Sequence, residues 1–413
     1  MVQLLAVGRA LPGPPHRQTD LSRIIGPLLT TDPSRLELLG RLHAATGVRT
    51  RHLVLPPQDY ADLGDFGRAN DLFLSRGSTL AAEACRAALA AAAVPAQDVG
   101  FLLFTSVTGV AAPSLDVRLV TSLGLRPEVR RMPSFGLGCA GGVAGIARLR
   151  DFLLGNPDRV GLLVSLELCS LTLQHGDDST ANLISSGLFG DGAAAVVMAG
   201  ADYEGSVHGG AARAAAATIA DPAAGTAADA GPDRASAATG DAAPDPEAVP
   251  VADTVEATRA HDLDVIASAS HLYPGTENQL GWHVGANGFA IMLAAGLPTL
   301  IEEHLAQDLD AFLTAQGLDR SQLSTWVVHA GGPRILEAVS TALDLPPEAL
   351  RASWESLAEA GNLSSASALH ILAATLDHDE PPPGGYAILL AFGPGVGAEF
   401  VLLRRQASPA APA

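Results

Sequence analysis

Short apolar runs with the length of β-strands alternate with helical segments along most of this chain. Residues 100–105, 159–167 and 192–199 are such runs, and residues 141–154 read as a helix between the first two. Strands that alternate with helices of this length favour βαβ units. The alternation therefore predicts a layered α/β fold.

The C-terminal half repeats the plan, with strands expected at 326–329 and 386–392 and a helix at 364–376. In both halves a small-residue-rich helix feeds a hydrophobic strand, and Cys139 and Asn362 stand just before those helices. The two halves therefore look like divergent copies of one unit. A length of 413 residues agrees, because a single core rarely exceeds roughly 250 to 300 residues.

We expect an N-terminal half at 1–204 and a C-terminal half at 258–404. Between them, residues 205–257 are rich in Ala, Asp, Pro, Gly and Thr and contain no Phe, Tyr or Trp. Such a segment buries too little apolar surface to offset its ordering entropy. The composition predicts a flexible insertion at 205–257, and we expect a disordered tail at 405–413.

Composition excludes several classes of function. The formal net charge of -19 argues against nucleic-acid binding, which requires a basic surface. A hydrophobic content of 48% with 17% charged residues fits a compact soluble protein. The opening apolar run, residues 2–8, is too short for a signal peptide, and later runs fall short of the ~20 residues that cross a bilayer. A cytoplasmic location is expected.

The three cysteines, Cys85, Cys139 and Cys169, are too few and too far apart for a disulfide framework or a zinc motif. Cys139 stands out because glycines flank it at the start of a helix, in Gly138-Cys139-Ala-Gly-Gly. Glycines permit a tight turn, and a helix N-terminus favours the thiolate by lowering the thiol pKa. A random cysteine is more often an inert core residue, but this context favours a nucleophile.

A thiol that transfers acyl groups also needs a proton acceptor and donors for the carbonyl oxygen. His329 follows a predicted strand and precedes the turn Ala-Gly-Gly-Pro333, where an imidazole can project into a cleft. Taken alone it would more often be structural. Asn362, in Gly361-Asn-Leu-Ser-Ser, could equally cap the helix that follows or donate a hydrogen bond to a thioester oxygen.

Taken together, these segments resemble chalcone synthase-like type III polyketide synthases, with Cys, His and Asn in that order and actinobacterial members closest. The resemblance also rests on residues 6–12, 108–115, 188–192, 270–274 and 281–285 and on Phe392-Gly-Pro-Gly. It implies a thiolase-like fold with a duplicated αβαβα core. It further implies an acyltransferase that loads an acyl-CoA starter on Cys139 and extends it with malonyl-CoA, supported by His329 and Asn362.

The resemblance assigns further residues by motif. Phe189 matches a gatekeeper phenylalanine, Phe289 a second gating phenylalanine, and Ala112 replaces a methionine that reaches across the dimer in the plant enzymes. It also implies a homodimer, no metal, and no cofactor besides the CoA thioester substrates. The remaining assignments are cavity residues Cys169, Thr172 and Ser364, cyclisation-loop residues Phe392, Gly393, Pro394 and Gly395, and CoA phosphate ligands Arg41, Arg49 and Arg51.

Three other interpretations are open. A ketoacyl-ACP synthase III uses the same three residue types, although its histidine usually precedes Gln-Ala-Asn and not Ala-Gly-Gly-Pro. A catalytically silent scaffold conflicts with the intact triad, and a cysteine protease conflicts with the duplicated plan. The starter is not readable from motifs. Small side chains in the expected cavity leave room for an aliphatic chain that ends as an alkylpyrone or alkylresorcinol, and aromatic and malonyl starters are open as well.

Overall fold

A computed structural model describes residues 1–205 and 251–407 of the chain. Most of the predicted insertion (206–250) and most of the predicted tail (408–413) lie outside the described residues. Within them, nine strands form one mixed sheet in the order β11-β12-β13-β8-β1-β7-β6-β4-β5. These strands are β1 (Val2–Pro12), β4 (Val99–Thr105), β5 (Arg130–Ser134), β6 (Val160–Leu168), β7 (Asp191–Ala199), β8 (Ala252–Leu272), β11 (Leu323–Val328), β12 (Tyr386–Gly393) and β13 (Gly397–Arg405).

The strand pairing is the same in the two halves. In the first half β1 pairs antiparallel with β7, β7 antiparallel with β6, and β6 parallel with β4. In the second half β8, β13, β12 and β11 repeat these three relations in the same order. The antiparallel pair β1 and β8 joins the two halves at the centre of the sheet. The predicted α/β fold with two similar halves is confirmed.

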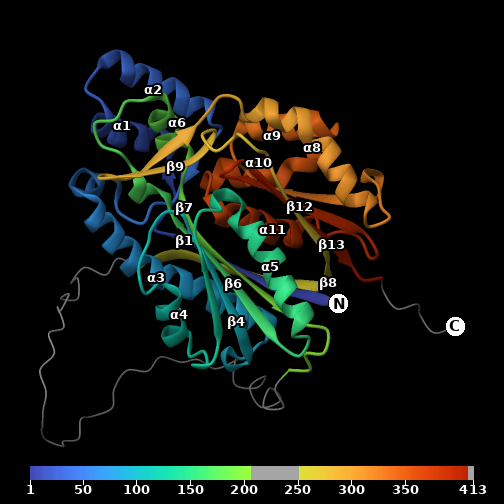
Figure 1. The fold of residues 1–413 in the computed structure, drawn as a ribbon. Coiled ribbons are helices and arrows are strands. Elements are labelled where there is room, and N and C mark those ends of the chain that lie inside the picture. The colour runs from blue at the N-terminus through green and yellow to red at the C-terminus, as the bar shows by residue number, and fades with distance from the viewer. Residues whose placement is uncertain (206–250, 408–413) are drawn as a thin grey trace, which may run out of the picture.

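Helices cover both faces of this sheet (Figure 1). On one face α3 packs against β1, β7 and β8, and on the other α5 and α11 lie side by side. Both of the latter begin beside the residues singled out above, Cys139 and Asn362. The helices are α1 (Gln18–Leu29), α2 (Pro33–Ala45), α3 (Phe66–Ala92), α4 (Asp116–Leu123), α5 (Gly141–Gly155), α6 (Thr180–Leu188), α8 (Leu297–Thr314), α9 (Pro333–Leu343), α10 (Arg351–Ala360) and α11 (Ser367–His378).

The apolar runs that suggested strands are buried on both sides. Along β6 every residue is buried, with Leu162 and Val164 in the core under α3 and Leu163 in the core under α5. Covered strands lose the apolar/polar alternation of a half-exposed sheet and read as continuous hydrophobic runs. This explains why the sequence pattern of these strands was strong.

Two predicted boundaries differ from the structure. Arg405, assigned to the disordered tail, is the last residue of β13 and pairs with Leu263. Residues 252–257, assigned to the insertion, begin β8 and pair with the far end of β1, for example Val255 with Ala10. The stretch contains Thr254 and Val255, which are β-branched and suit a strand, but its alanines and acidic residues hid that signal.

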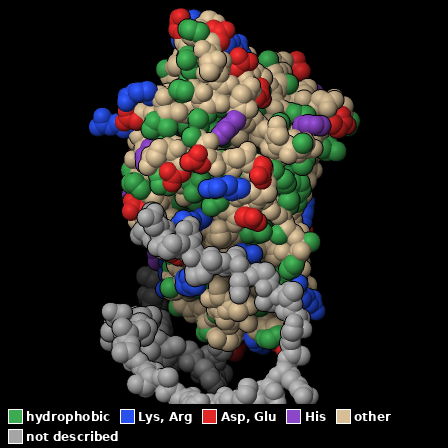
Figure 2. All heavy atoms as spheres, turned by 90° about the vertical axis from the view of Figure 1, so that its left-hand side faces the viewer, with side chains coloured by type: hydrophobic (Ala, Val, Ile, Leu, Met, Phe, Trp, Pro, Cys, Tyr) green, Lys and Arg blue, Asp and Glu red, His purple; other side chains and the backbone are tan. Residues whose placement is uncertain are grey.

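Charged side chains of both signs are interspersed over the face shown in Figure 2. This mixture is consistent with the acidic overall balance and unlike a nucleic-acid surface. No helix in the described parts of the chain combines the length and the hydropathy needed to cross a bilayer.

Candidate active site

Cys139 lies in a tight turn between the edge strand β5 and helix α5. The turn, a 3₁₀ segment at Gly138–Ala140, begins with Gly138 at a φ of +49°. A side chain at Gly138 would also meet Pro394, since an added Cβ would lie 2.5 Å from the Pro394 Cδ. The predicted glycine requirement therefore has two causes, the left-handed backbone and the close approach of the Gly-Pro-Gly loop.

His329 is the first residue after strand β11, as the sequence suggested. Its backbone N–H donates to the Leu390 oxygen at 2.9 Å, which ties it to the neighbouring strand β12. The side chain is 3% exposed, and neither ring nitrogen has a hydrogen-bond partner among the described residues. Buried imidazoles normally find partners, so this ring is available to a ligand.

Asn362 connects the segments that carry the other two residues. Its backbone pairs with the chain around Phe189, through Asn362 N–H to the Leu188 oxygen at 2.9 Å and Gly190 N–H to the Asn362 oxygen at 3.0 Å. Its Nδ2 donates to the Gly331 oxygen, 3.4 Å away in the turn that follows His329. Its Oδ1 accepts from the Ser364 N–H at 2.8 Å.

Ser364 in turn reaches the cysteine, because the Cys139 thiol lies 3.9 Å from the Ser364 Oγ. Contacts thus run from the His329 turn through Asn362 and Ser364 to Cys139. The structure brings together three residues that are far apart in the sequence. The two roles considered for Asn362 are compatible, since its oxygen serves the local turn while its amide hydrogens face the histidine turn.

Burial controls the protonation of this cluster. It raises the pKa of the Cys139 thiol to about 12 and lowers the pKa of His329 to about 4. The start of a helix was expected to lower the thiol pKa, and in the unliganded pocket burial outweighs that effect. Cys139 is therefore a thiol and His329 a neutral imidazole, and ionisation of the thiol requires transfer of its proton to a neighbour.

A buried acid, missed in the sequence, lies behind the cysteine. Glu167 on β6 is fully buried, and burial raises its pKa to about 7. It accepts hydrogen bonds from Thr108 Oγ1 at 2.9 Å and from Ser365 Oγ, and its charge opposes ionisation of Cys139. A single Glu inside the apolar run 159–167 was the available signal.

Two neighbouring pockets hold the predicted gate residues and two of the three predicted cavity residues, while Ser364 lines neither pocket. Phe189, Cys169 and Thr172 line the first, together with Trp282 and Ile291 from the hairpin β9 (Leu280–Gly285) and β10 (Gly288–Leu293). Phe289 lines the second pocket, where its ring packs edge-on against Phe66 at 5.3 Å. Trp282 lies between the two phenylalanines, 6.4 Å from Phe189 and 6.3 Å from Phe289 by ring centroids.

Within the first pocket Ile291, and not Phe289, shares the wall with Phe189. The two predicted gating phenylalanines thus line different pockets. Phe289 and Ile291 lie two positions apart in β10, so their side chains project from the same face of the strand. The sequence could not distinguish which of them reaches this pocket.

The Phe392 to Gly395 loop packs directly on the cysteine turn. Phe392 is buried, and an added Cβ at Gly393 would lie 2.3 Å from the Leu137 oxygen and 2.7 Å from the Ala140 Cβ. Only a glycine at 393 allows this approach. The loop therefore supports the turn that carries Cys139 from one side.

The three predicted CoA ligands lie in different environments. Arg41 is exposed on α2. Arg49 is exposed beside an open groove of about 740 Å³ and pairs with Glu359 at 3.4 Å. Arg51 is 2% exposed and bonds the Phe189 oxygen at 2.7 Å, so it does not fit a phosphate contact at the surface. In the described residues no group of three or more His, Cys, Asp or Glu side chains is placed to hold a metal ion.

Comparison with known proteins gives one family. Residues 1–203 match the N-terminal domain and residues 264–407 the C-terminal domain of "Chalcone and stilbene synthases". A 1,3,6,8-tetrahydroxynaphthalene synthase of Streptomyces peucetius subsp. caesius is 46% identical over 97% of this chain and 92% of its own length. An α-pyrone synthesis polyketide synthase-like Pks18 of Mycobacterium tuberculosis is 27% identical over 95% of this chain and 90% of its own length.

Among solved structures, the 1,3,6,8-tetrahydroxynaphthalene synthase of Streptomyces coelicolor A3(2) superposes with a TM-score of 0.78 at 30% identity, covering 98% of this chain and 99% of its own. Its description calls it a bacterial type III polyketide synthase. These matches do not support the ketoacyl-ACP synthase III alternative. The chain belongs to the chalcone and stilbene synthase family and is a type III polyketide synthase.

Proposed function

We propose that Cys139 is the nucleophile of this synthase, with His329 as its proton acceptor and Asn362 as an oxygen-binding donor. The observation that carries the assignment is the run of contacts from the His329 turn through Asn362 and Ser364 to the Cys139 thiol. His329 adds two ring nitrogens with no partner among the described residues. A buried imidazole linked to the thiol through Asn362 and Ser364 is suited to serve as the proton acceptor of the same site.

In the first step the Cys139 sulfur attacks the starter thioester carbonyl while the thiol proton moves to His329, and CoA leaves as its thiol. Malonyl-CoA then binds and loses CO₂, and the resulting enolate oxygen accepts hydrogen bonds from His329 and the Asn362 amide. The enolate carbon attacks the Cys139 thioester and expels the thiolate, which lengthens the chain by two carbons. Loss of CO₂ drives each extension, so the reaction needs no metal, flavin or nicotinamide.

Among products, we favour 1,3,6,8-tetrahydroxynaphthalene, after the relative that is 46% identical over nearly the whole chain. A naphthalene with oxygen on alternate ring positions is the expected outcome when a chain built only from malonyl units cyclises. An alkylpyrone is the second candidate, because a relative with 27% identity carries the name of an α-pyrone synthase. Mass spectrometry of products from malonyl-CoA alone and with acyl-CoA starters distinguishes the two.

We place the CoA phosphates in the groove beside Arg49, with Arg41 on the adjacent helix α2. The groove is open, carries Arg17 and Arg49 on its walls, and lies outside the buried cluster. Arginines bind phosphate oxygens through charge-assisted hydrogen bonds. The three unpaired cysteines suit a cytoplasmic enzyme, where thiols stay reduced.

We also propose a homodimer formed through the edge of the sheet at β5. Parallel pairing of β4 with β5 places the segments after both strands side by side. Strand β5 and those segments expose a group of large apolar side chains, and Ala112 is exposed among them. The group comprises Val110, Met132, Phe135 and Leu137, which are 40%, 37%, 52% and 37% exposed. Apolar residues gathered at an unpaired strand edge are typical of an interface.

Replacement of the nucleophile tests the central assignment. Cys139→Ala should abolish malonyl-CoA-dependent product and remove the thiol acylated by substrate, as detected by mass spectrometry of the intact protein. Cys85→Ala is the matched control, because Cys85 is buried in α3 in the separate core on the other face of the sheet. Product from Cys139→Ala, or an acylated Cys85, would refute the assignment.

A further inference from the structure

Arg51 is a buried cation with one unused donor. Its Nε donates to Gln18 Oε1 at 3.0 Å and its Nη1 to the Phe189 oxygen at 2.7 Å. Its Nη2 is buried and has no partner among the described residues. An unsatisfied buried nitrogen of a charged group is costly, and Arg51 lies on the wall of the first pocket.

Nearby groups compensate the charge of Arg51, but none of the described residues accepts a hydrogen bond from its Nη2. Asp191 attracts it electrostatically, yet the Asp191 oxygens accept from the N–H groups of Val54 and Ser170, each at 2.8 Å, and from the Ser170 hydroxyl. With a carboxylate close by, the site does not require an anionic ligand. A neutral carbonyl oxygen or a shared enolate would satisfy the free nitrogen.

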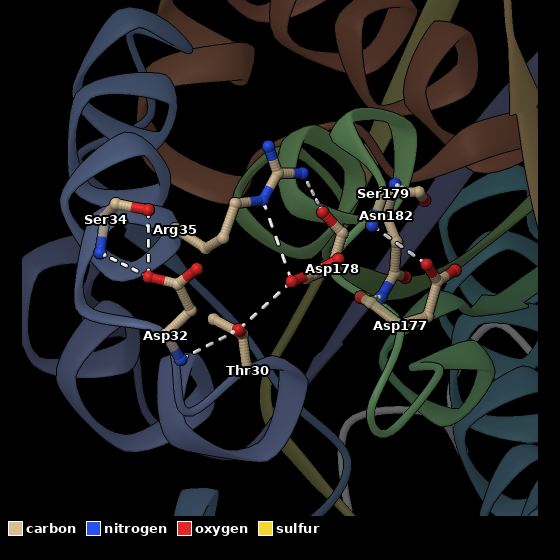
Figure 3. A network of polar contacts seen from close by, with 8 residues as sticks. All are labelled: Thr30, Asp32, Ser34, Arg35, Asp177, Asp178, Ser179 and Asn182. Atoms are coloured by element: carbon tan, nitrogen blue, oxygen red, sulfur yellow. Dashed lines mark hydrogen bonds and ion pairs between the residues drawn. The ribbon is translucent and has the colours of Figure 1, made fainter.

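The rest of the pocket wall is also rich in polar groups. Asn182 is held by hydrogen bonds from its Nδ2 to the Asp177 and Gln174 oxygens at 2.7 and 3.0 Å. Figure 3 shows this anchor beside a second one, in which Arg35 of α2 and Thr30 bind Asp178. Half of the lining residues are polar, and they are Arg51, Tyr60, Ser170, Thr172, Asn182, Ser185 and Ser186.

The pocket adjoins the proposed catalytic residues. Phe189 is on its wall and pairs with Asn362 through the backbone, and Cys169 on its wall is close enough to Cys139 that ionisation of one thiol would raise the pKa of the other. Its free volume is about 30 Å³. That is room for a water-sized group, so a growing chain enters only when side chains of the lining move.

We propose that Arg51 Nη2 donates a hydrogen bond to a keto or enolate oxygen of the growing poly-β-keto chain, so that the first pocket selects oxygen-bearing chains over alkyl chains. The inference rests on the proposed function and names the substrate feature that its cavity binds. A poly-β-keto chain presents an oxygen on every second carbon. An alkyl chain in the same place leaves the guanidinium nitrogen without an acceptor, and sites built for a hydrogen bond discriminate strongly against ligands that lack it.

Two assays on the intact enzyme test the inference. The first compares malonyl-CoA decarboxylation with formation of full-length product from malonyl-CoA alone. Arg51→Met should keep decarboxylation within about twofold while full-length product falls about tenfold or more and shorter lactones accumulate, the size expected for one lost charged hydrogen bond. The second assay mixes octanoyl-CoA with malonyl-CoA, and the octanoyl-primed share of product should rise in Arg51→Met.

Gln18→Met is the control, because it removes the bond to Arg51 Nε and the bond from Gln18 Nε2 to the Gly187 oxygen but leaves Arg51 Nη1 and Nη2 in place. It should change decarboxylation and full-length product by the same factor. Arg51→Lys serves if Arg51→Met does not fold, since one ammonium group cannot hold the Phe189 oxygen and reach the pocket together, and it should show the same shift in ratio.

The following results would contradict the inference or the proposed function. Equal loss of decarboxylation and full-length product in both Arg51 variants, or no loss in either activity, would overturn it, as would an unchanged octanoyl-primed share. Absence of malonyl-dependent product from the wild-type enzyme would instead refute the proposed function.

Discussion

At the scale of residues, the candidate site is defined by side chains that burial leaves with unused capacity. Among the described residues, His329 has two ring nitrogens without partners and Arg51 has an Nη2 without a partner, and the thiol of Cys139 lies 3.9 Å from the hydroxyl of Ser364. Most buried polar groups in folded proteins are satisfied. Two of these exceptions, His329 and Arg51, lie in segments bonded to the chain around Phe189 and Asn362, which marks this region as a candidate reactive centre.

Asn362→Asp separates the two roles of Asn362. Aspartate retains the oxygen that accepts from the Ser364 N–H, so the turn before α11 and the melting temperature should change little. It loses the amide hydrogens and places negative charge against a developing enolate, so malonyl-CoA decarboxylation should fall roughly 10² to 10³-fold.

The measurement pairs the melting temperature with separate rates of decarboxylation and of Cys139 acylation. Acylation should survive better than decarboxylation, because no enolate forms in that step. Near wild-type decarboxylation with unchanged stability would reduce Asn362 to a turn residue and leave His329 as the enolate ligand.

At the scale of elements, the site depends on two glycine-rich turns that pack against each other. One turn leads from β5 into α5 and the other from β12 into β13. Gly138 and Gly393 each lie within contact distance of the opposite turn. Neither turn can shift without moving the other, so the position of the thiol depends on both.

Gly138→Ala should therefore harm both stability and turnover. The new methyl group meets Pro394, and the turn holds the alanine at a positive φ that residues other than glycine rarely adopt. Together these effects should lower the free energy of unfolding by about 1–3 kcal/mol. Gly136→Ala is the control, because Gly136 also has a positive φ, +97°, but has open space around its Cβ position. Urea unfolding and product formation measure the effect. If the two variants behave alike, contact with the Gly-Pro-Gly loop is unimportant.

Helix α11 contains a buried histidine that links stability to pH. His370 Nε2 lies 2.9 Å from the Ala193 oxygen, and burial lowers the pKa of His370 from 6.5 to about 3. The unfolded chain therefore binds a proton at this residue between pH 6.5 and 3 that the folded chain does not. By linkage, this residue makes stability fall as pH falls through that window.

His370→Asn should remove the uptake of about one proton that accompanies unfolding in that pH window. Between pH 4.5 and 6 the slope of the unfolding free energy against pH should decrease by about 1.4 kcal/mol per pH unit. Urea unfolding at several pH values gives the slope, which is independent of any constant loss of stability caused by the smaller side chain. An unchanged slope would mean that His370 is protonated in the folded state.

At the scale of the whole molecule, β5 is one of the two edge strands of the sheet in the described residues, and the site lies close to that edge. Phe135, which follows β5, packs against Phe289 of the second pocket with ring centroids 6.1 Å apart. A partner on this edge would therefore cover a wall of the cavity. The proposed dimer and the proposed chemistry are linked through this region.

Met132→Asp should weaken the dimer, because it places a charge among the exposed apolar side chains of the edge. Sedimentation velocity at several protein concentrations should show monomer at concentrations where the wild type is dimeric. Leu154→Asp is the control, since Leu154 is 55% exposed on α5 and is not part of the β5 edge. A monomeric wild-type enzyme, or a Met132→Asp variant that dimerises normally, would contradict the proposal.

Local sequence was enough to predict the layered α/β fold, the similarity of its halves and the segments that carry Cys139, His329 and Asn362. Each depends on short-range patterns, namely apolar strand runs, glycines at tight turns and residues that follow a strand. The start of β8 was missed because its pairing with β1 joins positions more than 240 residues apart.

Only the tertiary structure decided the environment of each candidate residue. Burial by distant segments raised the Cys139 pKa, against the expectation from its helix, and enclosed Arg51, which the sequence grouped with the exposed Arg41 and Arg49. Packing of the β9–β10 hairpin decided that Ile291 and not Phe289 faces Phe189. Desolvation and contact depend on which segments meet in space, and spacing along the chain does not contain that information.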